Sequence, residues 1–187
     1  MINKENEKKI ILTEEEYLNI NSKFEKIEEK NQINYYFDTQ NYGLANNDET
    51  LRVRQSDCGL KLEYKFNKKY SSMIRECQEY SFSIKELPSE ISSHIITPFY
   101  DRDKTKFFLQ GQLVTYRKKF QLDRTEICLD SNYYLGKKDF ELEIECEEPE
   151  EIEKVIEILG CSCSSRVIGK YKRFLRQKET IGKNILE

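Results

Sequence analysis

The sequence predicts an α+β domain built on an antiparallel sheet, and two observations lead to this fold class. Several stretches alternate apolar and charged residues, the pattern of strands with one buried and one polar face. Two other stretches carry apolar residues at helical spacing. The chain has 187 residues and neither an internal repeat nor a low-complexity linker, so we expect a single domain over residues 1–187.

Charged residues are unusually frequent and almost balanced in sign. They make up 35% of the chain, above the roughly 25% of typical domains, but 31 basic and 34 acidic residues leave a net charge of only −3. Together with 12 Tyr and 10 Phe, this balance disfavours disorder, which pairs low hydrophobicity with high net charge. It also gives no basic surface for nucleic acid.

The chain carries no recognisable targeting segment. No run of about 18 apolar residues is present and the N-terminus is polar, so we expect no membrane span, no signal peptide and a cytoplasmic location. We therefore expect the scattered cysteines to be reduced. Zinc binding and catalysis by histidine are not expected, because His94 is the only histidine and the Cys161-Ser-Cys163 spacing does not suit zinc. The cysteines are Cys58, Cys77, Cys128, Cys146, Cys161 and Cys163.

The first predicted helix runs from Thr13 to about Lys30. Thr13-Glu14-Glu15-Glu16 is a capping-box pattern, in which the Thr hydroxyl and the third Glu satisfy free amides at a helix start. The apolar residues that follow at helical spacing are Tyr17, Ile20, Phe24 and Ile27.

The second predicted helix covers Pro149 to Leu159. Proline suits a first turn, acidic residues follow at the positive end, and Gly160 stops the helix. Shorter helical turns are expected at Leu87–His94 and Asp103–Gln110, and the tail Gln177–Glu187 as a loose helix or a cap.

Strands are predicted where apolar and charged residues alternate, and their polar faces are charged at nearly every position. Such alternation usually marks the solvated side of an antiparallel sheet. Glu141, Glu143 and Glu145, however, would place three like charges in a row on one face, a repulsive arrangement that weakens this explanation. The alternating stretches are Thr50–Arg54, Leu60–Phe66, Val114–Phe120 and Phe140–Cys146.

The N-terminal residues Glu5-Asn6-Glu7-Lys8-Lys9 have the pattern ExExK, which is weak alone. Six further segments follow in order, and together they resemble the CYTH, or triphosphate tunnel metalloenzyme, superfamily, most of all a bacterial subgroup of it. The resemblance extends from Glu5 to about Arg173. The segments are Tyr35-Tyr36-Phe37-Asp38-Thr39, Leu51-Arg52-Val53-Arg54, Lys61-Leu62-Glu63-Tyr64-Lys65, Tyr116-Arg117-Lys118, Asp139-Phe140-Glu141-Leu142-Glu143-Ile144-Glu145 and Gly169-Lys170-Tyr171-Lys172-Arg173.

This resemblance implies an eight-stranded antiparallel β-barrel whose charged interior forms a tunnel, with helices packed on the outside. The implied function is a metal-dependent triphosphatase, which hydrolyses inorganic triphosphate or a nucleoside or organic triphosphate. Two alternatives stay open: a class IV adenylate cyclase and a non-catalytic polyphosphate- or nucleotide-binding module. The expected partner is a small-molecule triphosphate, without nucleic acid or membrane, and the protein is a monomer or homodimer. The absence of Trp favours an inorganic or loosely specific triphosphate.

The resemblance also assigns roles to individual residues. Basic side chains would hold the phosphates, and carboxylates would bind Mg²⁺ or Mn²⁺, two ions in all, because hard cations prefer oxygen ligands. The expected triphosphate-binding residues are Arg52, Arg54, Lys61, Lys65, Arg117, Lys119, Lys170 and Arg173. The expected metal ligands are Glu5, Glu7, Glu141, Glu143 and Glu145. The residues expected at the catalytic step are Glu5, Glu7, Lys9 and Lys170. The residues expected to orient waters or form ion pairs are Asp38, Glu63 and Asp130.

Overall fold

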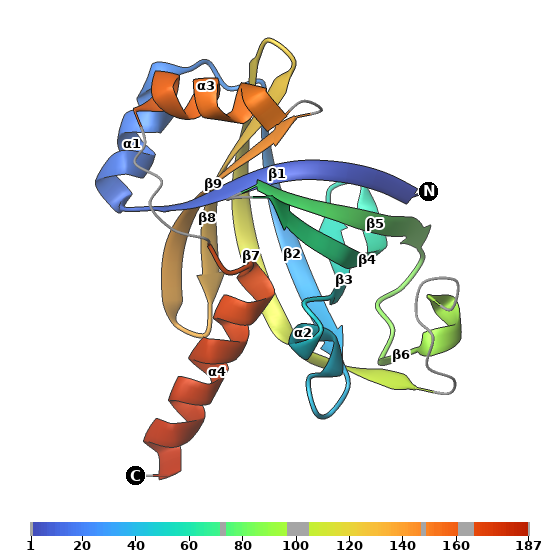
Figure 1. Cartoon of the computed structure of the whole chain (residues 1–187). Coiled ribbons are helices and arrows are strands. Elements are labelled where there is room, and N and C mark those ends of the chain that lie inside the picture. The colour runs from blue at the N-terminus through green and yellow to red at the C-terminus, as the bar shows by residue number, and fades with distance from the viewer. Residues whose placement is uncertain (1, 72–73, 97–104, 147–148, 161–166, 187) are drawn as a thin grey trace.

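The computed structural model describes residues 2–71, 74–96, 105–146, 149–160 and 167–186. It combines a large antiparallel sheet with helices (Figure 1). The strands are β1 (Ile2–Leu12), β2 (Glu28–Asp38), β3 (Thr50–Ser56), β4 (Gly59–Ser71), β5 (Ile74–Ile84), β6 (Glu90–Ser92), β7 (Lys106–Leu122), β8 (Thr125–Tyr134) and β9 (Lys137–Cys146). The helices are α1 (Glu14–Lys23), α2 (Gly43–Asn46), the short 3₁₀ turn η1 (Ser93–Ile95), α3 (Pro149–Leu159) and α4 (Lys170–Leu186).

The sheet closes on itself. Its strand order is β2-β3-β4-β5-β1-β9-β8-β7-β6, and β2 also pairs with β7. Eight strands therefore form a ring, and β6 extends the sheet from the start of the long strand β7. The predicted eight-stranded antiparallel fold is confirmed as this ring, and the four alternating stretches lie in β3, β4, β7 and β9.

Alternation along the strands separates a charged interior from an apolar exterior. In β3, Leu51 and Val53 are fully buried in an apolar cluster outside the ring, whereas Arg52 and Arg54 line a cavity inside it. Residues of one parity share a face, so each strand repeats this division. The charged faces point inward and the apolar faces need a cover.

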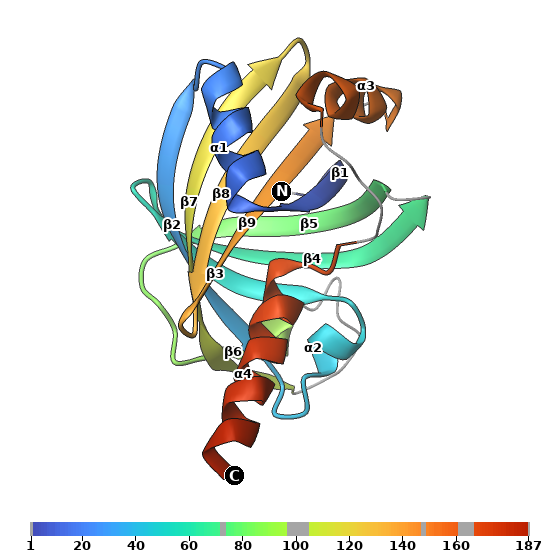
Figure 2. The ribbon, with the colours of Figure 1, turned by 90° about the vertical axis from the view of Figure 1, so that its left-hand side faces the viewer.

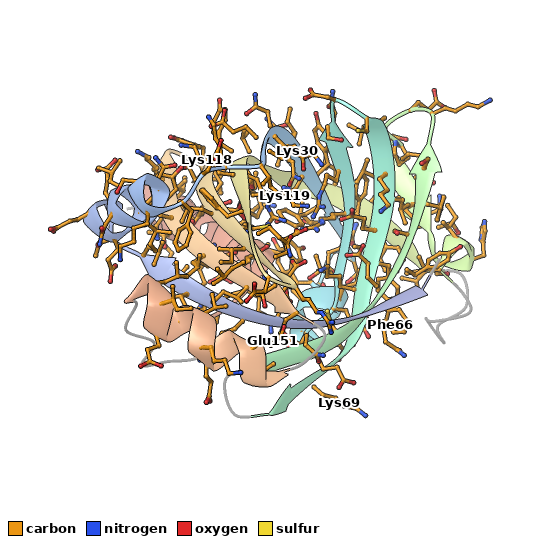
Figure 3. All side chains as sticks on the ribbon, turned by 90° about the horizontal axis from the view of Figure 1, so that it is seen from above. Lys30, Phe66, Lys69, Lys118, Lys119 and Glu151 are labelled. Carbon is orange, nitrogen blue, oxygen red and sulfur yellow. The ribbon has the colours of Figure 1, made fainter. Side chains whose placement is uncertain are left out.

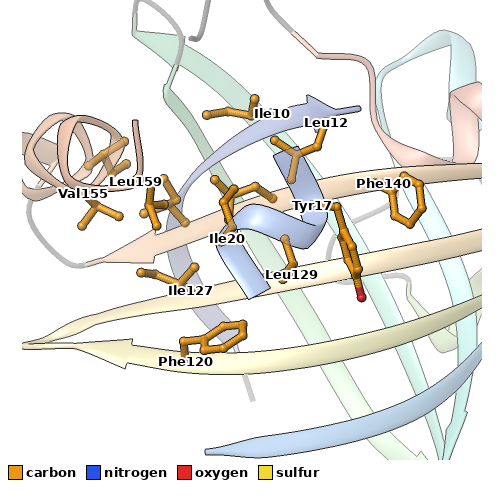
Figure 4. Packing of buried hydrophobic residues seen from close by; sticks show 13 residues of the cluster. Ile10, Leu12, Tyr17, Ile20, Phe120, Ile127, Leu129, Phe140, Val155 and Leu159 are labelled. Atoms are coloured by element: carbon orange, nitrogen blue, oxygen red, sulfur yellow. The ribbon is translucent and has the colours of Figure 1, made fainter. Parts of the chain in front are cut away.

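Helices α1 and α3 cover the outer face of β1, β7, β8 and β9. Tyr17 and Ile20 of α1 and Val155 of α3 pack into one cluster with strand residues such as Leu129 (Figure 4). The capping box is present: the Glu16 amide donates to the Thr13 hydroxyl, and the Thr13 amide to Glu16 Oε2 at 2.7 Å. Gly160 follows α3 with a positive φ of 67°, as the sequence predicts.

The first helix is shorter than the sequence predicts. It ends at Lys23, where Phe24 adopts an extended conformation, and the prediction to Lys30 is wrong. Residues from Glu28 onward pair with β7, and the Ile27 amide already donates to the Lys119 carbonyl at 2.9 Å. Pairing between the neighbouring strands β2 and β7 therefore prevails over the helical spacing of Ile27, whose side chain is 62% exposed.

The shorter helical turns are corrected in part. Within Leu87–His94, residues Glu90–Ser92 form β6 and the turn η1 begins only at Ser93. The expected turn at Asp103–Gln110 is wrong from Lys106 onward, because β7 begins there and pairs with both β6 and β2; residues 103 and 104 lie outside the described ranges.

Helix α4 closes one end of the ring instead of covering its outside (Figures 1 and 2). Its residues Tyr171 and Phe174 pack with Tyr36, Leu113 and Tyr134, which come from β2, β7 and β8. The closure thus lies in the first turns of α4, before the tail Gln177–Glu187 that the sequence suggested as a cap. The described part of the tail continues the same helix.

Two smaller expectations concern the thiols and the membrane. The four cysteines in the described ranges, Cys58, Cys77, Cys128 and Cys146, are free. Among the helices of those ranges, none combines the length and the apolar character that a membrane crossing requires.

Candidate functional site

The ring encloses a cavity of about 250 Å³ whose wall is dominated by charge. Ten basic and seven acidic residues line it, and Figure 3 looks into the ring from the end where Lys30 and Lys119 lie. The basic residues are Lys9, Lys30, Arg52, Arg54, Lys61, Lys65, Arg117, Lys119, Lys170 and Lys172. The acidic residues are Asp48, Glu49, Glu63, Glu79, Glu126, Glu143 and Glu145.

Most of the basic residues selected from the sequence meet in this cavity. They come from four strands and helix α4, and the ring brings the strand residues together because every second residue of a strand faces inward. Arg173 differs, since its guanidinium binds Asp139, Glu141 and the Ile168 carbonyl. The selected residues on the cavity wall are Lys9, Arg52, Arg54, Lys61, Lys65, Arg117, Lys119 and Lys170.

Glu63 holds two arginines of β3 in place. Nε of Arg52 lies 2.7 Å from Glu63 Oε2, and NH2 of Arg54 lies 3.3 Å from the same oxygen. Burial alone would lower the pKa of Arg52, but the charge of Glu63 outweighs it and the pKa is raised. Arg52 therefore remains charged, and one carboxylate orients both guanidiniums.

Three buried carboxylates gather beside this basic wall. Asp130 faces Glu141 across the β8–β9 ladder, and Glu143 follows two residues later on the same face of β9. One oxygen from each of the three lies within 4.8 Å of the other two. We call Asp130, Glu141 and Glu143 the carboxylate cluster.

Basic side chains already contact the carboxylate cluster. Arg117 donates two hydrogen bonds to Asp130, at 2.8 and 2.7 Å, and also binds Glu143. Burial alone would raise the pKa of Glu143, but nearby positive charges, first that of Arg117, hold it well below the usual 4.5. Glu143 is therefore ionised, and the neighbouring Arg117 and Lys170 balance its charge.

Glu7 and Glu145 extend the acidic region. They face each other in the β1–β9 ladder; Glu145 lines the cavity, and Glu7 Oε2 lies 2.9 Å from Nζ of Lys9. Burial and the charge of Glu143 raise the pKa of Glu145. Glu5 lies in β1 opposite Cys77, but its side chain is outside the described part of the structure.

The donor chemistry of the carboxylate cluster fits a divalent ion. It offers only carboxylate oxygens, the ligands that Mg²⁺ and Mn²⁺ prefer, and they are close enough together to share one ion. Asp130 therefore joins Glu141 and Glu143 as a candidate ligand, whereas the sequence suggested it only for ion pairing or water orientation.

Asp38 forms hydrogen bonds outside the carboxylate cluster. Its carboxylate accepts hydrogen bonds from the amides of Leu44 and Ala45 and from the Tyr171 hydroxyl. These contacts attach α2 and α4 to the end of β2, and the described partners of Asp38 are amides and a hydroxyl rather than a basic group. Its place in the fold is that of an anchor.

Sequence reasoning missed several cavity residues on β2 and β5. Lys30, Gln32, Asn34 and Tyr36 line the wall at alternate positions of β2, and Glu79 of β5 lies 3.2 Å from Lys65. The alternation in β2 was a usable signal, since these residues share one parity. The helix predicted from Thr13 to about Lys30 overlaps the start of this strand and so obscured the alternation.

A family comparison agrees with this architecture. The model of the CYTH domain matches residues 3–167. A protein of Bacillus subtilis (strain 168) named putative triphosphatase YjbK is 29% identical over 145 residues, which cover 73% of this chain and 74% of the relative.

Solved structures share the fold. A crystal structure of a putative adenylate cyclase from Bacillus halodurans matches with a TM-score of 0.74 and 20% identity, over 92% of this chain and 98% of that one. HpAC1 from Hippeastrum, described as a putative adenylyl cyclase with a dominant triphosphatase activity, matches with a TM-score of 0.71 and 21% identity, over 92% and 95%. The ring, its charged interior and the match of the CYTH model over most of the sequence lead to one conclusion: the chain belongs to the CYTH domain family.

Proposed function

We propose that this protein is a divalent-metal-dependent hydrolase of triphosphates, with inorganic triphosphate as its preferred class of substrate. The observation that carries the proposal is the cavity itself, in which ten basic residues stand beside a buried carboxylate cluster. A triphosphate chain carries about four negative charges and needs several cations from different directions. The names of the Bacillus subtilis relative and of the Hippeastrum neighbour support this proposal.

The chain's own residues would contribute electrostatics and position. Arg52, Arg54 and Arg117 would bind phosphoryl oxygens as bidentate donors, with the lysines as point charges, and stabilise charge on the leaving phosphate. Glu141, Glu143 and Asp130 would hold the metal, with Glu5, Glu7 and Glu145 as further candidates. When bound, Mg²⁺ or Mn²⁺ would neutralise phosphate charge and orient the phosphate chain. A second ion is part of the proposal.

The cavity wall favours a compact substrate. Its volume of about 250 Å³ is below the roughly 300–1,000 Å³ of pockets for larger organic ligands. Among the described lining residues the aromatic ones are Tyr36 and Tyr171. Their ring centroids are 4.6 Å apart in a stacked pair and both residues are buried, so neither offers an exposed face to a base. Both features favour inorganic triphosphate over a nucleotide or thiamine triphosphate.

The test is phosphate release from tripolyphosphate, ATP and thiamine triphosphate with Mg²⁺ or Mn²⁺, for the wild type and for Glu5→Gln/Glu7→Gln. We expect orthophosphate, fastest from tripolyphosphate, and a large loss in the double variant. Robust turnover by that variant would refute the roles of Glu5 and Glu7.

The same incubation separates two other functions. Adenylate cyclase activity, which the name of the Bacillus halodurans neighbour suggests, would yield cyclic AMP and pyrophosphate from ATP. A binding module would leave every triphosphate intact and bind it with little dependence on metal. The buried carboxylate cluster disfavours this last function, because an anion-binding module has no need of it.

A further inference from the structure

The ammonium group of Lys170 lies in the middle of the carboxylate cluster. Nζ is 2.9 Å from Asp130 Oδ2 and 2.7 Å from Glu143 Oε1, and it also contacts Glu141. Lys170 is 9% exposed and is the first residue of α4. One cation thus contacts all three carboxylates that are the candidate ligands of a divalent ion.

The neighbouring cations repeat this arrangement. Arg117 binds Asp130 and Glu143, and Lys9 binds Glu7 and Glu143. All three basic residues line the cavity; Arg117 and Lys170 belong to the set proposed to hold phosphates, and Lys9 to the residues expected at the catalytic step. In this structure the groups proposed for phosphate and the groups proposed for metal therefore neutralise each other.

A divalent ion cannot enter this arrangement without a change of partners. Its place among the three carboxylates is taken by an ammonium group, and two cations only a few ångströms apart repel each other strongly in a buried site. A displaced ammonium group in turn needs a new anion, because a buried unpaired charge is costly. A triphosphate in the same cavity supplies that anion.

We propose that Lys170 is an internal counter-ion which occupies the metal position of the substrate-free protein and moves to a phosphate when metal and triphosphate bind together. The triphosphate gives the displaced ammonium group a new anion, and the metal ion gives the carboxylates a new cation. Each ligand therefore favours binding of the other, and their binding is positively coupled. This inference rests on the proposed function and adds to it an order of preference: the metal binds weakly alone and tightly with the substrate.

The anchoring of α4 makes Lys170 the suitable residue for this exchange. The Tyr171 hydroxyl donates to Asp38 at 3.0 Å, and Nε of Arg173 donates to Asp139 at 3.0 Å, so the first turn of the helix is fixed on both sides. The exchange therefore needs only rotation of one flexible four-carbon side chain.

The test measures Mn²⁺ binding by calorimetry on the full chain, without turnover. In the absence of triphosphate, we expect Lys170→Met to bind Mn²⁺ at least about fivefold more tightly than the wild type, the low end of usual coupling. Lys170→Arg, which keeps the charge, should stay near the wild type. Lys106→Met is the matched control, because its exposed side chain pairs with Glu90 away from the cavity. Equal or weaker Mn²⁺ binding by folded Lys170→Met would overturn the proposal.

A second measurement does not depend on the variants. Imidotriphosphate, in which NH replaces the bridging oxygens, should tighten Mn²⁺ binding by the wild type at least about fivefold, after subtraction of the Mn²⁺ held by the free analogue. Lys170→Met should show less of this coupling. If the variant does not fold, absence of coupling in the wild type still overturns the inference.

The two proposals fail separately. Hydrolysis of tripolyphosphate without any coupling would retain the function and reject the exchange. Tighter Mn²⁺ binding by Lys170→Met without hydrolysis of any triphosphate would retain Lys170 as the occupant of the metal position and reject the hydrolase.

Discussion

Gly111 of β7 lies directly against the ring of Phe174 in α4: a β-carbon at Gly111 would stand 2.4 Å from Cζ of Phe174. Gly111 has a φ of 147° and pairs with Tyr36 where the β2–β7 register shifts. The absence of a side chain therefore allows α4 to close the end of the ring. Because Lys170 begins this helix, the contact also sets the position of a cavity residue.

We expect Gly111→Ala to lower the free energy of unfolding and the affinity for triphosphate. The backbone conformation alone costs about 1–2 kcal/mol with a β-carbon, and the clash with Phe174 adds about 1–3 kcal/mol. Urea unfolding and calorimetry with imidotriphosphate measure the two effects. Gly59→Ala is the control, since Gly59 also has a positive φ, 102°, but open space around it. Equal losses of stability in the two variants would contradict the role of the Phe174 contact.

Two stacked tyrosines differ in what their hydroxyl groups do. The Tyr171 hydroxyl donates to Asp38, whereas the buried Tyr36 hydroxyl has no hydrogen-bond partner among the described residues. Removing a satisfied hydrogen bond costs about 1 kcal/mol, and removing an unsatisfied buried group costs nothing or stabilises. Tyr171→Phe should therefore lower the free energy of unfolding by about 1 kcal/mol, and Tyr36→Phe should leave it unchanged or raise it. The reverse order in urea unfolding would show that Tyr36 has a partner of its own.

The interior of the ring was predictable from the sequence where alternation is strict. Arg52, Arg54 and Glu63 lie on strands whose other face is apolar, so local spacing alone separates the charged face from the apolar face. The family pattern then indicated which of the two faces is inside. Where apolar residues at helical spacing ran into a strand, as near Lys30, this local spacing wrongly predicted a helix.

The partners of the inward groups were not predictable. Lys170 and Glu143 are far apart in sequence, and their contact depends on where α4 enters the ring. That position is set by the approach of Phe174 to Gly111 together with the hydrogen bonds of Tyr171 and Arg173. Asp38 has the same parity in the sequence as the inward residues, but it lies at the end of β2. There its carboxylate accepts hydrogen bonds from the amides of α2 instead of facing the cavity. Register and closure are long-range properties, and a single sequence carries no direct signal for them.

Asp139 should make stability depend on pH in the acid range. Its carboxylate accepts hydrogen bonds from Tyr134, Asn132 and Arg173. Burial alone would raise its pKa, but the charge of Arg173 and these donors outweigh it and hold the pKa below the usual 3.8. A lowered folded-state pKa means that the stabilisation is complete above the unfolded value and is lost as pH falls through the folded one.

Asp139→Asn should therefore lower the free energy of unfolding by about 1–3 kcal/mol at neutral pH, because it removes one of the two carboxylates that pair with Arg173. The difference between wild type and variant should shrink as the pH falls below about 4. Urea unfolding of both proteins across this range measures it. Asp48→Asn, at the partly exposed Lys172–Asp48 pair, should show only a small difference at any pH. A difference for Asp139→Asn that is constant with pH would contradict the ion pair.

Arg52 and Arg54 share Glu63 but should respond differently to substitution. The Arg52 side chain is 12% exposed and lies close to the carboxylate at 2.7 Å, whereas that of Arg54 is 22% exposed and lies at 3.3 Å. Arg54 therefore has more freedom to bind a phosphate, and Arg52 forms the closer ion pair with Glu63.

We expect Arg54→Gln to reduce kcat/KM for tripolyphosphate at least about tenfold, the loss of one charge-assisted hydrogen bond, with little change in stability. Arg52→Gln should reduce kcat/KM similarly and also cost about 1–3 kcal/mol of unfolding free energy, since buried Glu63 loses its nearer partner. Phosphate release and urea unfolding of the two variants provide the comparison. If both variants lose the same stability, the pairing with Glu63 is shared equally and the distinction between the two arginines is wrong.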